Sequence, residues 1–387
     1  MKKILWLASW YPNRKDPFDG DFIQRHARAV SRYCEVHVIY VTKDENCREK
    51  METTIHEEGN LTEEIIYYRS ARTGIGMANR FLSHQRYLQC YRDAITAYIR
   101  RSGKPALIHV HVAIKAGLAA LWAKEKWGIP FIVSEHWTGY LPEADIKLEQ
   151  LLPVYRRMVG KVMKEASIVT AVSACLCESI KKYFPAVPCR EVPNVVDTKI
   201  FYPSASSSSG NLKLVHASNM TYQKNVEAII SALAILKASI PGFEMLLYGP
   251  VRSSVQEMIT GLGLQENIQL KGEVPQNELA KAMQRADALI LYSRFESFGC
   301  VLAEANACGL PVIVSDLPVF HEFIFEGKNG VWVKPGDPAA LAAAIIDFAA
   351  RKEEFDHATI ATTAASKYNY DVIGKQFILV YDQFTTY

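Results

Sequence analysis

Two glutamates eight positions apart, Glu296 and Glu304, are the residues of this chain whose spacing points most directly to chemistry. An apolar run at 288–291 precedes the first acid, and small residues surround the second. This order predicts a strand, a loop and a helix, and the first turn of a helix offers free backbone N–H groups to an anion. Acids in the loop and in the second helical turn could flank a phosphate group. Such a pair could hold a sugar nucleotide, one acid at the sugar hydroxyls and the other at the ribose diol.

The alternative for this pair is a solvated helix face, which is where most glutamates lie. The residues at 300–308 are apolar nearly all round the expected helix, so this helix should be buried. A carboxylate in a buried helix needs a partner or a ligand. The surroundings of Glu304 therefore favour a ligand site over a solvated face.

The length of 387 residues predicts two domains. A hydrophobic fraction of 49% and a charged fraction of 22% are ordinary for a globular protein. No run of about 18 uncharged apolar residues occurs, so no membrane-spanning helix is expected. We interpret the short apolar run near the N-terminus as a first buried strand, because it is too brief for a signal peptide.

The eight cysteines are scattered, at positions 34, 47, 90, 175, 177, 189, 300 and 308. Cys175 and Cys177 lie close together, but the second half of a zinc or redox motif is missing. Several of the cysteines stand in apolar stretches, as small buried side chains do. This usage fits a reducing compartment, and we expect a cytoplasmic protein.

Charge is distributed unevenly along the chain. The first 200 residues hold 30 lysines and arginines against 22 acids, and the remainder holds 14 against 19. A basic first half indicates an anionic partner or peripheral contact with the inner face of a membrane, and ordinary surface scatter is an equal alternative. Nothing in the sequence indicates nucleic-acid binding.

Strand-like and helix-like runs alternate through both halves, which predicts parallel sheets covered by helices. The small-residue segment at 204–210 is interpreted as a linker. The expected fold class is α/β, with two Rossmann-like domains that face each other across a central cleft. These domains are expected at residues 1–203 and 211–369, followed by a helix within 370–387 that packs back on the first domain.

With these features the chain resembles the retaining glycosyltransferases of family 4, which have the GT-B fold. Glu296 and Glu304 match the E-x7-E motif of that family, and Pro193–Pro203 is similar to its segment before the second domain. The resemblance covers nearly the full length and is densest from Leu212 to Ala350. It is specific for the fold and the reaction type, and only weakly specific for the substrates.

The resemblance implies a nucleotide-sugar site in the second domain and an acceptor site mainly in the first. Glu304 would hold the ribose hydroxyls, and Glu296 would lie beside the transferred sugar. Lys224 would neutralise the leaving diphosphate, so neither a metal nor another cofactor is expected. Four consecutive residues would offer backbone N–H groups to the sugar and the diphosphate: Phe298, Gly299, Cys300 and Val301.

One position departs from the family pattern. Five residues before Lys224 the family usually has arginine, and this chain has Asn219. A cation for the donor diphosphate is therefore missing at that position. Arg294 and Arg252 are the candidates to replace it.

In the first domain the resemblance points to Gly20 and His136. Gly20 matches the first glycine of a Gly-Gly loop near the diphosphate, and the alternative is a simple turn before a helix capped by Asp21. His136 follows the end of a strand, where open α/β sheets place ligands. It resembles a family histidine near the donor sugar, and we predict a catalytic role for it together with Glu296 and Lys224.

Two further histidines and a serine are assigned to acceptor binding or to structure. Alternation along a strand sends His109 and His111 to the same face, which could bind a metal, but no third ligand is evident. A structural or acceptor-side role is favoured, with His111 as the acceptor-binding candidate. Ser173 follows a strand and would either cap a helix or touch the acceptor, and capping is the simpler expectation.

The segment 81–101 combines arginines with apolar residues at helical spacing. Family members that act on lipid-linked acceptors often dock their first domain on a membrane, and such a basic amphipathic helix would serve that purpose. A helix packed on its own sheet has the same pattern.

The expected activity is retaining transfer of a sugar from a nucleotide-diphosphate donor to an acceptor hydroxyl. UDP is expected as the nucleotide because it prevails in the family, and the acceptor is expected to be a glycan or a lipid-linked molecule in cell-surface polysaccharide or glycolipid assembly. The alternatives are a catalytically silent sugar-nucleotide-binding subunit and another GT-B sugar-nucleotide enzyme. A dinucleotide-dependent dehydrogenase is disfavoured, because no G-x-G-x-x-G follows the first strand.

Overall fold

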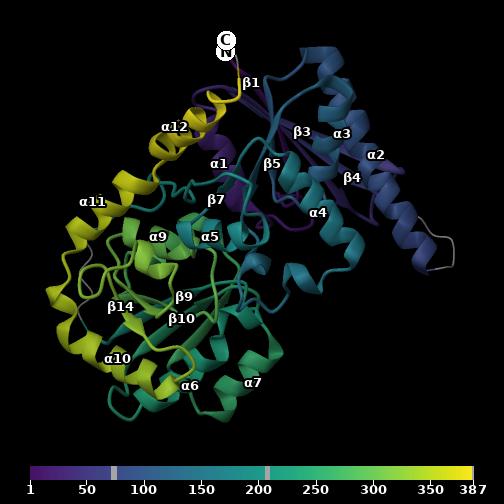
Figure 1. Ribbon diagram of the computed structural model, residues 1–387. Coiled ribbons are helices and arrows are strands. Elements are labelled where there is room, and N and C mark those ends of the chain that lie inside the picture. Colours follow the sequence, from purple (N-terminus) through teal and green to yellow (C-terminus); the bar gives the residue numbers. More distant parts are fainter. Residues whose placement is uncertain (71–75, 205–209, 386–387) are drawn as a thin grey trace. The chain divides into compact units, whose positions relative to one another are not determined.

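The computed structural model describes residues 1–70, 76–204 and 210–385, and most of the segment predicted as a linker lies outside this range. The chain divides into two compact units (Figure 1). Unit 1 consists of Met1–Tyr140, Ile146–Val195 and Tyr370–Tyr387, and unit 2 of Leu141–Asp145 and Val196–Asn369.

Unit 1 is built on an eight-stranded sheet in the order β3-β4-β2-β1-β5-β6-β7-β8. Its strands are β1 (Lys3–Ala8), β2 (Glu35–Lys43), β3 (Met51–Glu58), β4 (Leu61–Tyr68), β5 (Leu107–His111), β6 (Phe131–Glu135), β7 (Val169–Ala171) and β8 (Cys189–Glu191). All neighbours among these strands pair in parallel except β3, which runs antiparallel to β4. Strands β5 and β6 are buried along their whole length, as is usual for a parallel sheet with both faces covered.

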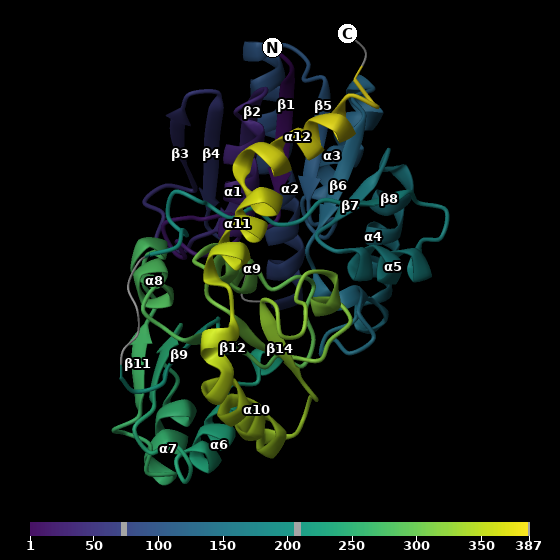
Figure 2. The same ribbon diagram turned by 90° about the vertical axis from the view of Figure 1, so that its left-hand side faces the viewer.

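The helices of unit 1 include one that returns from the C-terminal end of the chain (Figure 2). They are α1 (Asp21–Val30), α2 (Gly76–Ser102), α3 (Gly117–Trp127), α4 (Pro153–Glu165), α5 (Ala174–Tyr183) and α12 (Tyr370–Tyr381). Helix α12 packs so closely against α1 that a Cβ atom at Gly374 would lie 2.5 Å from the carbonyl oxygen of Ala29. Its side chains Ile373 and Phe377 join the core of β1 and α1.

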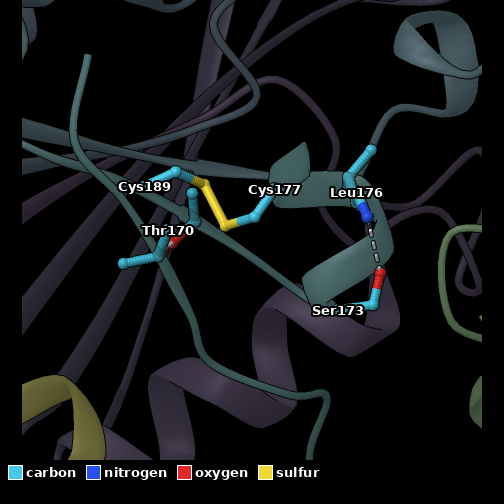
Figure 3. Close-up of a disulfide and its surroundings, with 6 residues drawn as sticks. Thr170, Ser173, Leu176, Cys177 and Cys189 are labelled. Atoms are coloured by element: carbon cyan, nitrogen blue, oxygen red, sulfur yellow. Dashed lines mark hydrogen bonds between the residues drawn. A yellow bond between two sulfur atoms is a disulfide. The ribbon is translucent and has the colours of Figure 1, made fainter. Parts of the chain in front are cut away.

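A disulfide joins Cys177 of α5 to Cys189 of β8 (Figure 3). The interpretation of the scattered cysteines as fitting a reducing compartment did not anticipate this pair. The two residues are 12 positions apart in sequence, and α5 packs against β8 so that their Cα atoms lie 5.7 Å apart. The sequence spacing alone did not reveal this approach, because it depends on how the helix returns to the sheet edge.

Unit 2 contains a six-stranded sheet in the order β11-β10-β9-β12-β13-β14, with parallel pairing throughout. The strands are β9 (Lys213–Ala217), β10 (Glu244–Tyr248), β11 (Ile268–Gly272), β12 (Ala288–Leu291), β13 (Val312–Ser315) and β14 (Gly330–Val333). Each of these strands is followed by a helix or a helical turn, so the unit repeats the βα pattern of a Rossmann-like domain.

The helices of unit 2 are α6 (Val226–Leu236), α7 (Ser253–Gly261), α8 (Gln276–Met283), α9 (Cys300–Ala307), α10 (Pro338–Arg351) and α11 (His357–Tyr368). Helix α6 packs against α10, and α9 packs against α11. Apolar side chains of α6 and α10 meet those of the strands in one continuous core. None of the helices in the described residues is long and apolar enough to cross a membrane.

Candidate functional site

The loop after β9 is held by a buried histidine. The two ring nitrogens of His216 lie 2.8 Å from the carbonyl oxygen of Ile290 and 2.7 Å from the hydroxyl of Ser218. Burial lowers the pKa of His216 to about 4, so the ring is neutral near pH 7. The Ser218 hydroxyl accepts a hydrogen bond from the backbone N–H of Met220, which has a φ of 50°. This chain of contacts fixes the loop that leads to Lys224.

Glu296 is the centre of a polar network in the loop after β12. Its carboxylate forms an ion pair with Lys224, and it accepts hydrogen bonds from the Gln223 amide at 3.0 Å and the Ser293 hydroxyl at 2.9 Å. Only 4% of the Glu296 side chain and 16% of the Lys224 side chain are exposed. Two of the predicted site residues, from separate loops, are thus held in direct contact.

Glu304 lies in the second turn of α9 and is 5% exposed. The helix is apolar around it, as the sequence indicated, so this carboxylate is carried into a buried setting by a small-residue helix. Gly299 caps the helix with a φ of 88°, and a Cβ atom there would lie 3.2 Å from Leu302 and Phe320. A side chain at this position would be strained, so glycine allows the loop to turn directly into the helix.

The other residues predicted to contact the donor at this helix differ in exposure. The Phe298 ring is buried and stacks on Phe323, with ring centroids 4.9 Å apart. Cys300 and Val301, in the first turn of the helix, are half-buried. The Phe298 side chain therefore serves packing, and its backbone is the part left for a ligand.

Asn219 is exposed, and its side-chain oxygen accepts a hydrogen bond from the Thr221 hydroxyl at 2.9 Å. The Arg252 guanidinium lies 3.4 Å from the Asn219 carbonyl oxygen. Arg294 instead stacks on the Tyr222 ring, with its guanidinium carbon 4.1 Å from the centroid, and it pairs with Glu227. Of the two candidate replacements for the missing cation, Arg252 is beside the position and Arg294 braces the neighbouring loop.

Gly20 in unit 1 adopts a φ of 63° immediately before α1. A Cβ atom there would lie 2.6 Å from the backbone of Trp10, so the close approach of two backbone segments requires glycine. Asp21 is the first residue of α1 and pairs with Arg25 at 3.3 Å. The alternative in which Asp21 caps the helix is not the observed arrangement, because Gly20 is the capping residue.

Three buried histidines gather in unit 1 from three different elements. His26 on α1, His111 at the end of β5 and His136 after β6 each offer a ring nitrogen, and these nitrogens all lie within 4.8 Å of one another. Burial lowers the pKa of each ring, so the rings are neutral near pH 7. Three neutral imidazoles are a suitable ligand set for a transition metal such as zinc. For the pair His109 and His111 no third ligand was evident in the sequence, and the structure instead places His26 and His136 beside His111. Both residues are distant from His111 in sequence.

His109 differs from the histidines of this cluster. Its ring nitrogens contact the Tyr381 hydroxyl at 2.7 Å and the Ser134 hydroxyl at 2.6 Å. Both nitrogens are thus used inside the core, and one of them holds the final helix. His109 has a structural role.

Glu135 is a residue that the sequence analysis did not single out. Its carboxylate accepts hydrogen bonds from the backbone N–H of Ala113 at 2.9 Å and from the Tyr140 hydroxyl at 3.0 Å. The side chain is completely buried, and burial raises its pKa to about 7. Its place beside His136 at the end of a parallel strand was the available signal.

Ser173 caps helix α5 (Figure 3). Its hydroxyl accepts a hydrogen bond from the backbone N–H of Leu176 at 3.1 Å, and the residue is 1% exposed. This is the simpler of the two roles considered for it, and acceptor contact through this hydroxyl has no support in the geometry.

Two family models match consecutive parts of the chain. The model described as Glycosyltransferase Family 4 matches residues 22–200, and the model described as Glycosyl transferases group 1 matches residues 200–364. Over 248 residues the chain is 26% identical to N-acetyl-alpha-D-glucosaminyl L-malate synthase from Bacillus anthracis. This match covers 61% of the chain and 63% of the relative, which is less than two thirds of the relative's length.

Solved structures resemble the whole chain. Sucrose-phosphate synthase from Thermosynechococcus elongatus has a TM-score of 0.79 at 20% identity, with 99% of each chain covered. The Anabaena protein HepE in complex with UDP and glucose has a TM-score of 0.73 at 18% identity, with 99% of this chain and all of HepE covered. At these identities the likeness concerns the fold alone.

Proposed function

The chain belongs to glycosyltransferase family 4 and has the GT-B fold, and we propose that it transfers a sugar from a UDP sugar to an acceptor hydroxyl with retention at the anomeric carbon. The observation that carries this proposal is the network in unit 2 that joins Lys224 to Glu296. Glu304 is buried in the helix that follows the same loop. The three groups suit the three parts of a nucleotide sugar. The cation of Lys224 suits the diphosphate, Glu296 beside it suits the sugar hydroxyls, and the buried Glu304 suits the ribose hydroxyls.

Lys224 has the chemistry needed to support the leaving diphosphate. In the described structure its ammonium group neutralises Glu296, and a donor would bring a second anion to the same cation. Fixed positive charge in a half-buried site stabilises the charge that develops on a leaving group. We infer that Glu296 and Gln223 keep the lysine in place, and that Glu296 also contacts hydroxyls of the transferred sugar.

The proposed transfer needs no metal ion, because Lys224 and backbone N–H groups at α9 supply the positive charge. We assign the acceptor to unit 1, with His136, which is 7% exposed, as the contacting group and the fully buried His111 stacked on its ring. In this scheme a donor phosphate oxygen accepts the proton of the acceptor hydroxyl. Neutral His136 would orient the reacting groups rather than carry a charge.

Thermal unfolding in the presence of EDTA tests the donor site. UDP, GDP and ADP are compared, and a ligand at about 100 times its dissociation constant should stabilise the native state by about 2.7 kcal/mol. We expect the largest shift with UDP. Glu304→Ala should abolish it, whereas Glu353→Ala, at an exposed position of the same unit, should preserve it. Equal responses to all three nucleotides, or no response, would refute the assignment of UDP.

Asn219 is the observation that favours a second candidate, a silent subunit that binds the sugar nucleotide without transferring the sugar. The usual cation is absent at this position, and Arg252 beside it is exposed. Slow hydrolysis of a UDP sugar by the purified chain separates the two candidates. Turnover that disappears in Lys224→Met supports the enzyme, and donor binding without turnover supports the silent subunit.

A further inference from the structure

A cavity of about 480 Å³ lies within unit 1, at the ends of several strands. Its walls come from the end of β2, the loop after β5 and the facing sides of α2 and α4. The volume is in the range of small-molecule sites, roughly 300–1,000 Å³. The histidine cluster does not line this cavity, so it is a separate feature of the unit.

The cavity combines an apolar interior with lysines. Tyr87 of α2, Leu118 of α3, and Met158 and Val159 of α4 supply apolar walls. Three lysines line the same cavity: Lys15, Lys43 and Lys115. The Lys43 ammonium pairs with Glu45 at 3.0 Å and the Lys15 ammonium donates to the Lys43 carbonyl oxygen at 2.7 Å, so we assign the contact with a ligand anion to Lys115. An uncharged apolar ligand would not need this cation, and a small anion would not need the apolar walls. The composition fits a ligand with an apolar chain and a negative group.

The loop that carries Lys115 is held in a conformation that L-residues rarely adopt. Val112 and Lys115 have φ values of 69° and 70°. The Ser9 hydroxyl donates to the carbonyl oxygen of Val112 at 2.9 Å, and Glu135 accepts from the N–H of Ala113. Such strain costs on the order of 1–3 kcal/mol per residue and is concentrated at functional sites. Lys115 therefore lies on a loop that hydrogen bonds hold in a strained backbone conformation.

The apolar surface continues from the cavity to the outside at the start of α4. Tyr155 lines the cavity and is 41% exposed, and next to it Leu152 and Val154 are 63% and 55% exposed. Apolar side chains in solvent at a cavity mouth indicate a contact with an apolar phase or ligand. Two arginines, Arg156 and Arg157, follow on the same helix, as in helices that lie on anionic membranes.

Helix α2 contributes to this rim only with its first turns. Phe81 and Leu82 are exposed near its start, whereas Tyr91 and Ile95 are fully buried against the unit. The greater part of the basic amphipathic pattern at 81–101 is thus explained by packing on the sheet. The surface at the cavity mouth is limited to the starts of α2 and α4.

We propose that this cavity binds the apolar chain of a phosphate-bearing membrane lipid that carries the acceptor hydroxyl. The inference rests on the proposed transferase function and narrows its acceptor to a lipid-linked molecule. The chain would enter past Leu152 and Tyr155, and the phosphate would lie against Lys115. Binding of the apolar chain would position the acceptor hydroxyl in unit 1, so the protein would not need contacts with many sugar rings of a glycan acceptor.

Calorimetric titration of the full chain with decyl phosphate, below its micelle-forming concentration, tests this inference. Butyl phosphate has the same head and a short chain, and decyltrimethylammonium has the same chain and the opposite charge. We expect decyl phosphate to bind at least tenfold more tightly than either. Equal binding of butyl phosphate would overturn the apolar site, and equal binding of decyltrimethylammonium would overturn the role of the lysines.

Variants place the binding in the cavity. Ser83→Phe fills space at a half-buried position that lines the cavity, and Lys115→Gln removes one cation. Each substitution should lower the affinity for decyl phosphate at least tenfold. Lys181→Gln, at an exposed position of the same unit, should leave binding unchanged. If Ser83→Phe does not fold, Lys115→Gln alone decides, and unchanged affinity in that variant would refute the site.

A vesicle experiment separates the lipid from a free anion. The wild-type chain should sediment together with phosphatidylglycerol vesicles. Val154→Glu should reduce the fraction of protein found in the vesicle pellet severalfold. Binding in the presence of excess inorganic phosphate should persist, and its loss would show a phosphate site without lipid recognition. Because UDP stabilisation is measured independently in unit 2, failure of lipid binding with an intact UDP response refutes this inference and leaves the proposed function standing.

Discussion

At the scale of single residues, the pair of Lys224 and Glu296 links stability to function. Both groups are largely withdrawn from solvent, and each neutralises the other. A buried ion pair is weak evidence of net stabilisation, but removing one partner leaves an uncompensated charge. The pair therefore gives different outcomes for single and double substitutions, and these outcomes distinguish structural from catalytic roles.

Lys224→Met should lower the free energy of unfolding by about 3 kcal/mol, because the Glu296 carboxylate loses its cation. The double variant with Glu296→Gln should recover most of this loss, since neither charge remains. Sugar transfer should stay at least a hundredfold reduced in both variants, because the diphosphate still lacks its cation. Denaturant unfolding and donor turnover are the two measurements. Additive losses of stability would show that the ion pair does not couple these residues.

At the scale of elements, the buried strands of both sheets could be predicted from apolar runs, and the exposed ones could not. The run at 288–291 coincides with β12, whose four residues are all buried. Strand β3 has polar and exposed residues along its length, so it carries no apolar pattern and was not predicted. Helix α11 was also missed, because its sequence mixes alanine and threonine without strong periodicity.

The candidate site shows the same division between local and long-range information. The loop-and-helix position of Glu296 and Glu304 follows from neighbouring residues, and the sequence was sufficient to predict it. The ion pair of Glu296 with Lys224 and the gathering of His26 with His136 depend on chain crossings between distant elements. Spacing along a sequence contains no such information, so these contacts required the structure.

Glu135 gives a pH-dependent prediction for the element formed by β6 and the loop after β5. Its pKa is raised from 4.5 to about 7 by burial, so the folded protein binds more protons than the unfolded chain between these values. Stability must therefore fall as pH rises through this window, by about 1.4 kcal/mol per pH unit. Glu135→Gln keeps an oxygen for Ala113 and Tyr140 and cannot ionise.

We expect wild-type protein to lose roughly 3 kcal/mol relative to Glu135→Gln between pH 5 and pH 8. The buried histidines have lowered pKa values and act in the opposite direction, but they are common to both proteins and cancel in the difference. Denaturant unfolding at several pH values provides the comparison. Parallel pH profiles would mean that Glu135 is ionised in the folded state at pH 5.

At the scale of the whole molecule, the chain stays in unit 1 up to Val195 apart from Leu141–Asp145, then forms the rest of unit 2 and returns to unit 1 with α12. Unit 1 is therefore completed only by the last residues of the chain. Phe377 of α12 is 1% exposed in the core with β1, and Tyr381 holds His109. Lys224, Glu296 and Glu304, to which we assign donor contacts, all belong to unit 2. A defect in α12 should consequently weaken one unit and spare the donor residues in the other.

Phe377→Ala should destabilise unit 1 by about 3–5 kcal/mol, the usual cost of removing a buried phenylalanine ring. Amide hydrogen exchange, read peptide by peptide, should show faster opening in α1, β1 and β5, while peptides of β9, β12 and α9 keep their wild-type rates. UDP should still slow exchange in α9 of the variant. Phe325→Ala, at an exposed phenylalanine, provides the matched control and should alter neither unit. If exchange accelerates equally in both units, they open as one cooperative body, and the donor site then depends on the C-terminal helix as much as the acceptor side does.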